Sequence, residues 1–138
     1  MARPDFVSSK VARVLEWLDH AERLISVSPP LLADMERRDL ASFYIFLGAQ
    51  KSISLAARWV ADAGWGSPED AASIFDVLAD HKAIDRDLAE SLRGAVGLRN
   101  RIADGYAPVD PAKIQSQFRE AAEAMRRFLA LVSSEAGL

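Results

Sequence analysis

The sequence contains no cysteine and only two histidines. Without cysteine the chain has no disulfide, no thiolate nucleophile and no cysteine-ligated metal, which suits a reducing cytosol. His20 and His81 are far apart and lack the short spacing of a zinc motif. We therefore predict that the protein binds no metal and no cofactor, and that both histidines are surface residues rather than catalytic bases.

The chain also lacks an apolar run of the ~20 residues that a membrane span requires, and no apolar segment of a signal peptide follows Met1. Positive charge is not in excess, because 17 Lys and Arg face 20 Asp and Glu for a net charge of -3. Any RNA contact must therefore come from a local basic patch. These absences predict a cytoplasmic protein with no membrane partner. The length of 138 residues predicts one domain over residues 1–138.

Apolar residues recur every three or four positions in five segments, and no segment alternates with a period of two. The second segment is apolar on nearly all sides, which indicates a central helix. We predict an all-α protein, a five-helix up-and-down bundle. We expect the first helix to start at Ser9 and stop at Ser28, the second to run from Asp39 to Ala63, and the third from Ser67 to Ala79. The fourth is expected to run from Asp85 to Ala103 or Asp104, and the fifth to start at Asp110-Pro111.

The expected fourth helix carries an arginine and two glycines at unusual positions. Because a helix turns about 100° per residue, Arg99 falls on the same stripe as the apolar Leu92 and Ile102. An arginine there must extend its charged end to solvent at the bundle edge, pair with a buried carboxylate, or face a shared cleft. Gly94 and Gly97 lie towards the opposite side. They are either simply tolerated or allow a second copy of the chain to approach closely.

Asp104 projects about 140° away from Arg99 on an ideal helix, so their spacing alone does not form one site. A frayed helix end or a second subunit would be needed. Negative charge at a helix C-terminus is unfavourable, and we expect Arg101 or Arg93 to compensate Asp104. Gln50 either satisfies a core contact or lines a cleft beside Arg99. The RNA patch that we predict is an electropositive cleft formed by Arg93, Arg99 and Arg101 of two subunits.

The segment Gly97-Leu98-Arg99-Asn100-Arg101-Ile102-Ala103-Asp104-Gly105-Tyr106, followed by Val109-Asp110-Pro111, resembles the signature of HepT-like proteins. These are minimal members of the HEPN group, whose motif is R-x-x-x-x-H-x-Y. The resemblance extends upstream through Ser67-Pro68, Ile74-Phe75-Asp76-Val77-Leu78 and Leu88-Ala89-Glu90-Ser91-Leu92. It implies a five-helix bundle that is homodimeric through the motif helix, with two motifs facing one cleft.

Active HepT-like proteins are metal-independent endoribonuclease toxins. They are paired with an MNT-type nucleotidyltransferase antitoxin, which can attach AMP to the motif tyrosine. In this chain Arg99 matches the motif arginine, which would hold the scissile phosphate, and Asn100 matches the polar residue that often follows it. Tyr106 matches the modified tyrosine, and Asp104 stands where the motif has histidine.

The aspartate at position 104 changes the expected chemistry. Histidine can take or give a proton near neutral pH, whereas an ordinary aspartate, with a pKa of about 4, is a weak base and is not an acid. Its charge would also repel the phosphate. We predict a toxin of an MNT/HEPN toxin–antitoxin pair that has lost its ribonuclease activity. The first alternative is a non-catalytic dimeric module that binds a nucleotidyltransferase or RNA. The second is a small-ligand pocket with Arg99 and Gln50 as its polar anchors.

Overall fold

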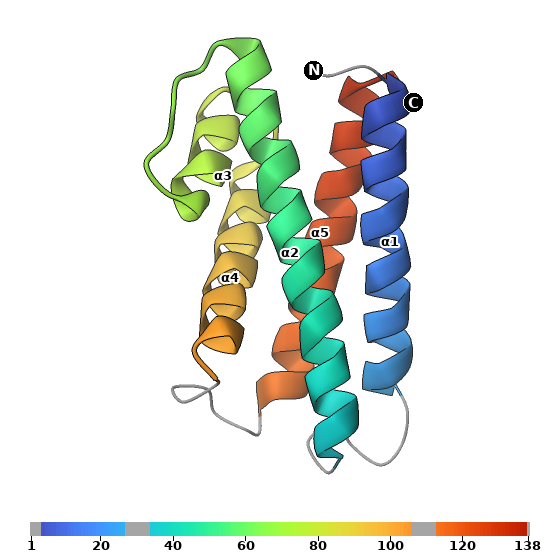
Figure 1. Cartoon of the computed structure of the whole chain (residues 1–138). Coiled ribbons are helices and arrows are strands. Elements are labelled where there is room, and N and C mark those ends of the chain that lie inside the picture. The colour runs from blue at the N-terminus through green and yellow to red at the C-terminus, as the bar shows by residue number, and fades with distance from the viewer. Residues whose placement is uncertain (1–3, 27–33, 106–112, 138) are drawn as a thin grey trace.

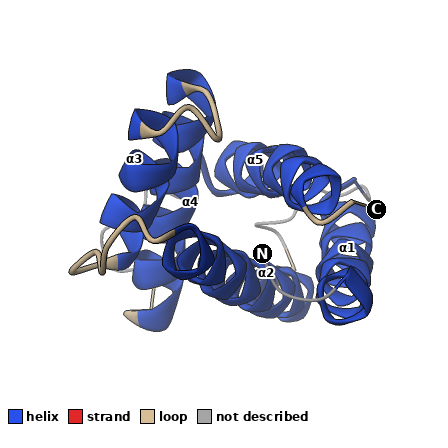
Figure 2. Cartoon of the chain, turned by 90° about the horizontal axis from the view of Figure 1, so that it is seen from above, coloured by secondary structure: helices blue, strands red, loops and turns tan. Residues whose placement is uncertain are grey.

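In the computed structural model, which describes residues 4–26, 34–105 and 113–137, the chain forms five helices (Figure 1). They are α1 (Pro4–Ser26), α2 (Met35–Ala63), α3 (Ala71–Asp80), α4 (Arg86–Ala103) and α5 (Ile114–Glu135). Seen from above, α3 and α4 lie together at one end of the bundle and α1 at the other, with α2 and α5 between them (Figure 2). α3 packs against α2 and α4, and its Phe75 and Leu78 are buried in the core. The predicted all-α five-helix bundle is confirmed, and the described residues contain no strand.

α2 is the central helix, as its apolar sequence predicts. It packs against each of the other four helices, and Gly48 allows a close approach to two of them. A Cβ atom at position 48 would lie 3.3 Å from the side chain of Leu18 on α1 and 3.4 Å from the sulfur of Met125 on α5. Among the described residues, α2 is also the one helix long and apolar enough to cross a membrane. Its place at the centre of the bundle accounts for this apolar composition.

The bounds of the first helix differ from the prediction, and those of the fifth are only partly described. α1 begins before the predicted cap Ser9, which lies inside it. The reason is that Val7 is buried in the core, at 1% exposure, so the apolar face of the helix extends past Ser9 towards the N-terminus. The predicted stop at Ser28 and the predicted start at Asp110-Pro111 both lie outside the described residues.

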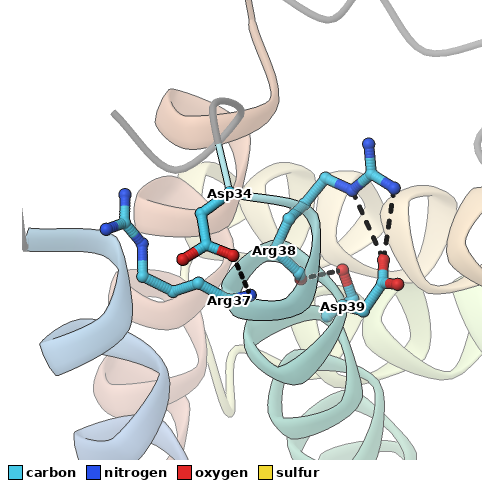
Figure 3. Close-up of polar contacts among 5 residues, drawn as sticks. Asp34, Arg37, Arg38 and Asp39 are labelled. Carbon is cyan, nitrogen blue, oxygen red and sulfur yellow. Dashed lines mark hydrogen bonds and ion pairs between the residues drawn. The ribbon is translucent and has the colours of Figure 1, made fainter. Parts of the chain in front are cut away.

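α2 also begins earlier than expected, because Asp34 rather than Asp39 caps it (Figure 3). The Asp34 carboxylate accepts a hydrogen bond of 3.1 Å from the backbone N–H of Arg37, which satisfies one of the free donors of the first turn. Asp39 lies inside the helix and forms an ion pair of 3.2 Å with Arg38. The Arg38 carbonyl in turn accepts a hydrogen bond from the Ser42 hydroxyl. This pairing balances the charge of Asp39 next to the groove described below.

The two helices that follow are both capped by aspartate. Asp70, and not the predicted Ser67, caps α3, and its carboxylate accepts a 2.8 Å hydrogen bond from the backbone N–H of Ser73. Hydrogen bonds from the side chain and backbone of Ser73 lower the pKa of Asp70. Asp85 caps α4 as predicted, with a 2.8 Å hydrogen bond from the N–H of Leu88. The start of the helix that carries the motif is thus fixed locally.

Candidate functional site

Arg99 is held by two neutral amide side chains. Its Nη1 donates to Oε1 of Gln50 on α2 at 3.0 Å, while Nε and Nη2 donate to Oδ1 of Asn100 at 3.2 and 2.8 Å. Within the described part of the chain these are its acceptors, which leaves one N–H on Nη1 and one on Nη2. Neutral amides orient the guanidinium without compensating its charge. Arg99 therefore presents a full positive charge and two donors, which suit two oxygens of a phosphate.

The contact between Gln50 and Arg99 decides two of the alternatives left open by the sequence. Gln50 is exposed and lines the site beside Arg99, so its interpretation as a core residue is wrong. Arg99 is partly buried at the edge of the bundle, and among the described residues no carboxylate pairs with it. The interpretation of Arg99 as the partner of a buried carboxylate is therefore also wrong.

The three arginines predicted to form one patch do not meet within one chain. Arg93 forms an ion pair with Asp76 of α3, whereas Arg99 contacts α2. Arg101 lines a groove between α4 and α5. They diverge because positions 93, 99 and 101 point in three directions on a helix that turns about 100° per residue. Of the three, Arg99 is thus the one whose guanidinium is held by neutral amide side chains, Gln50 and Asn100, in the described part of the chain.

An apolar groove of about 270 Å³ adjoins the contact between Arg99 and Gln50. Phe43 lies in it with 55% of its surface exposed. Ile102 lies one turn beyond Arg99, and Phe46 lies one turn before Gln50, so the groove continues directly from the site. An exposed aromatic ring at a groove is typical of a surface that another molecule covers. The groove is lined by Asp39, Ser42, Phe43, Phe46 and Ile102.

Asp104 lies exposed just after the end of α4. Its backbone N–H donates to the carbonyl of Asn100 at 3.1 Å, and Gly105 follows with a φ of 84°, which is the left-handed stop that the sequence predicts. Among the described residues no ion pair compensates its carboxylate, so the expected pairing with Arg101 or Arg93 is wrong. Within one chain the structure shows no contact between Asp104 and the guanidinium of Arg99.

Neither histidine is placed to replace the missing one. His20 on α1 stacks on Tyr44, with ring centroids 5.0 Å apart. His81 follows α3 and stacks on Trp65 at 4.3 Å. It precedes the start of α4, whereas Arg99 is near the end of that helix, roughly 20 Å away at 1.5 Å per residue. Within one chain, the described hydrogen bonds of Arg99 are to Gln50 and Asn100 and to neither histidine.

Two further expectations concern residues around the site. Tyr106, the predicted modification site, lies outside the described residues. In the ranges that the structure describes, no three histidine, aspartate or glutamate side chains gather as potential metal ligands. Sequence reasoning did not single out Phe43 or Phe46, because α2 is apolar on nearly all sides and its pattern does not tell which side stays uncovered.

Comparison with solved structures gives close matches in fold. A tri-AMPylated Shewanella oneidensis HEPN toxin in complex with MNT antitoxin has a TM-score of 0.87 and 18% identity, covering 97% of this chain and 99% of that one. A toxin–antitoxin with AMP-PNP has a TM-score of 0.86 and 17% identity, with 94% and 98% covered. A mutant of the toxin–antitoxin MntA–HpeT has a TM-score of 0.84 and 18% identity, with the same coverage.

The bundle is therefore that of HEPN toxins, because the likeness extends over nearly the whole chain. A family model described as ribonuclease HepT-like matches residues 14–132. The chain belongs to the ribonuclease HepT-like family, as its motif segment predicts. A comparison with curated proteins found no match.

Proposed function

We propose that this chain is the toxin component of a toxin–antitoxin pair and that its Arg99 site binds a phosphate of RNA. The observation that carries the proposal is the guanidinium of Arg99, held by the neutral amides of Gln50 and Asn100 with two N–H groups left for a ligand. The two non-bridging oxygens of an RNA phosphate can accept hydrogen bonds from these two N–H donors. Membership of the HepT-like family and the likeness to HEPN toxins crystallised with antitoxins support the same role.

The reaction that the family membership implies is an internal transesterification of RNA. The ribose 2′-oxygen bonds to the neighbouring phosphorus while the bond from phosphorus to the 5′-oxygen breaks, leaving a 2′,3′-cyclic phosphate and a 5′-hydroxyl. One proton must leave the 2′-hydroxyl and another must reach the 5′-oxygen. Arg99 would stabilise the charge that develops on the phosphoryl oxygens. An aspartate in place of the motif histidine removes the group that both takes and gives a proton near neutral pH. We therefore expect this chain to bind RNA without cleaving it.

We also propose that the chain forms a homodimer through the groove beside Arg99. A second copy lying over this groove would bury the ring of Phe43, which is 55% exposed, and Ile102. The two ends of α4 would then face each other, and position 104 of one chain could approach Arg99 of the other. This arrangement would bring Arg99 and Asp104 together through a second subunit, one of the two ways that their spacing leaves open.

The proposed pairing with an MNT-type nucleotidyltransferase antitoxin predicts that Tyr106, the tyrosine at the motif position, is modified. Incubation with the cognate MNT-type nucleotidyltransferase and ATP should increase the mass of the protein by one or more AMP units. Tyr106→Phe should stay unmodified, and intact-mass spectrometry followed by peptide mapping measures both. An unchanged mass of the starting protein, with a nucleotidyltransferase proven active on another toxin, would argue against this partner.

The non-catalytic module stays the second candidate, because Asp104 itself favours it. Restoring the motif histidine separates the two. If Asp104→His cleaves RNA, the chain is a toxin with its acid–base group replaced. If the restored protein is inert on RNA while still binding the nucleotidyltransferase, the chain is an interaction module.

A further inference from the structure

The edge along which α1 packs against α2 carries a regular pattern of aromatic and basic side chains (Figure 1). On α1 the pattern recurs at spacings of four, three, four and three residues, which form one line along the helix: Phe6, Lys10, Arg13, Trp17 and His20. On α2 it recurs at every seventh residue: Tyr44, Lys51 and Arg58. All eight side chains are exposed or half-buried. We call this surface the α1–α2 seam.

Two contacts fix how the two lines of the seam lie against each other. The guanidinium of Arg58 lies 5.3 Å from the ring centroid of Phe6, and the rings of His20 and Tyr44 stack with their centroids 5.0 Å apart. On each helix the two contacts are 14 residues apart, or about 21 Å at 1.5 Å per residue. Midway between them on both helices, Arg13 of α1 therefore lies level with Lys51 of α2.

The centre of the seam places two positive charges side by side. Among the described residues neither Arg13 nor Lys51 forms an ion pair. Glu16, one turn from Arg13, is exposed and does not pair with it either. Like charges at one level repel each other, and an anion that contacts both relieves this repulsion.

At one end of the seam an aromatic ring collects two further cations. The ammonium of Lys10 and the guanidinium of Arg58 each lie 5.3 Å from the ring centroid of Phe6. A ring orients a cation without neutralising it. Arg58 also forms a long ion pair of 3.7 Å with Asp62, and 53% of its side chain stays exposed.

The acidic residues on the opposite edge of α1 are paired. Asp19 and Glu22 contact Arg126 of α5, at 2.6 and 2.8 Å. α1 therefore carries paired carboxylates towards α5 and cations towards α2. This separation creates a local basic surface on a chain whose net charge is -3.

We infer that the α1–α2 seam binds single-stranded RNA, as an extension of the Arg99 site. The inference rests on the proposed function, which makes RNA the ligand of Arg99. Surfaces that bind single strands combine cations that follow the backbone with aromatic rings on which bases stack, and the seam has both. Gln50, the partner of Arg99, is the residue next to Lys51, so a strand that leaves Arg99 across α2 reaches the seam.

The seam lies outside the groove of Phe43. That groove is lined by residues of α2 and α4, and by none of α1. Gln50 and Lys51 point about 100° apart, the first towards α4 and the second towards α1. A second copy over the groove therefore leaves the seam accessible to RNA.

The central pair of cations gives the main test. A double variant, Arg13→Ala with Lys51→Ala, is compared with the starting protein by fluorescence anisotropy with a labelled single-stranded RNA. The affinity should fall by about tenfold or more, and the salt dependence by about two phosphate contacts. The matched control, Lys113→Ala with Arg119→Ala, removes the same charge from exposed positions at the start of α5. Equal losses for the two double variants overturn the inference, and circular dichroism establishes that each is folded.

Arg99→Ala, measured beside them, separates this inference from the proposed function. A loss for Arg99→Ala without a loss for the seam variant overturns the seam and leaves the Arg99 site standing. The reverse result overturns the Arg99 site and supports the seam.

Two competing ligands test the assignment to single-stranded RNA. A duplex RNA of the same length should bind at least about fivefold more weakly, because its bases are stacked on one another and cannot stack on the rings of the seam. Equal affinity for the duplex overturns the assignment. The surface belongs instead to the protein partner if the seam variant loses binding to the nucleotidyltransferase while its RNA affinity is unchanged.

Discussion

Asp104→His is expected to convert the chain into a ribonuclease that works in EDTA, at least about 10²-fold faster than the chain as written. A positioned proton donor and acceptor contributes about 10²–10⁴-fold to reactions of this kind. Position 104 is exposed after the end of α4, with φ of -90° and ψ of 5°, a conformation typical of type I turns and one with negative φ that histidine can adopt as aspartate does. The substitution therefore changes the chemistry of the position and leaves the fold intact.

Two controls separate the effect of the proton-transfer group from that of charge. Asp104→Asn removes the negative charge and adds no titratable group, so it should bind RNA more tightly than the chain as written and still not cleave it. Arg99→Ala in the histidine background should abolish cleavage. The products should end in 2′,3′-cyclic phosphate, and growth arrest should follow expression without the antitoxin. Equal cleavage by the asparagine and histidine forms would place the acid–base group elsewhere.

Phe128→Ala is expected to destabilise the fold by about 3–5 kcal/mol, the usual range for removing a buried phenylalanine ring. Phe128 on α5 is completely buried. Its ring centroid lies 6.2 Å from that of Trp59 on α2 and 5.4 Å, edge to face, from that of Phe75 on α3. Its removal would leave a cavity where three helices meet. Such a loss is a large part of the roughly 5–15 kcal/mol that stabilises a typical domain.

Urea denaturation followed by circular dichroism measures this loss, and Phe6→Ala is the matched control. Phe6 on α1 is 39% exposed, so its removal should lower the free energy of unfolding much less. Equal losses for the two variants would mean that Phe128 is not a centre of the core.

The helices and their buried faces follow from the sequence, because burial imposes the three-to-four residue spacing that makes them recognisable. Helix starts are harder to predict, since several residues near a start can act as caps. Asp34 and Asp39 both have suitable chemistry, and so do Ser67 and Asp70. Packing further along the chain decides between them. The residues around a helix start do not indicate how the rest of the chain packs.

Part of the candidate site could likewise be predicted from the sequence, and part could not. Arg99 and Asp104 stand out by their match to a motif, and helical spacing alone correctly separates them within one chain. The contact of Gln50 with Arg99 depends on how α2 and α4 lie against each other, which the sequence left open. The exposure of Phe43 was not predictable, because a helix apolar on nearly all sides does not show which side its neighbours leave free.

The proposed binding of RNA through Arg99 is tested most directly by the RNA affinity of the chain as written, which we expect to leave the RNA intact. Fluorescence anisotropy with a short labelled RNA, over a series of salt concentrations, compares the starting protein with Arg99→Ala and Arg119→Ala. Arg99→Ala should lower the affinity about 10- to 100-fold and reduce the salt dependence by about one phosphate contact per chain. Arg119→Ala makes the same change in net charge on an exposed part of α5 and should have little effect. Equal losses for the two variants would contradict a phosphate site built on Arg99.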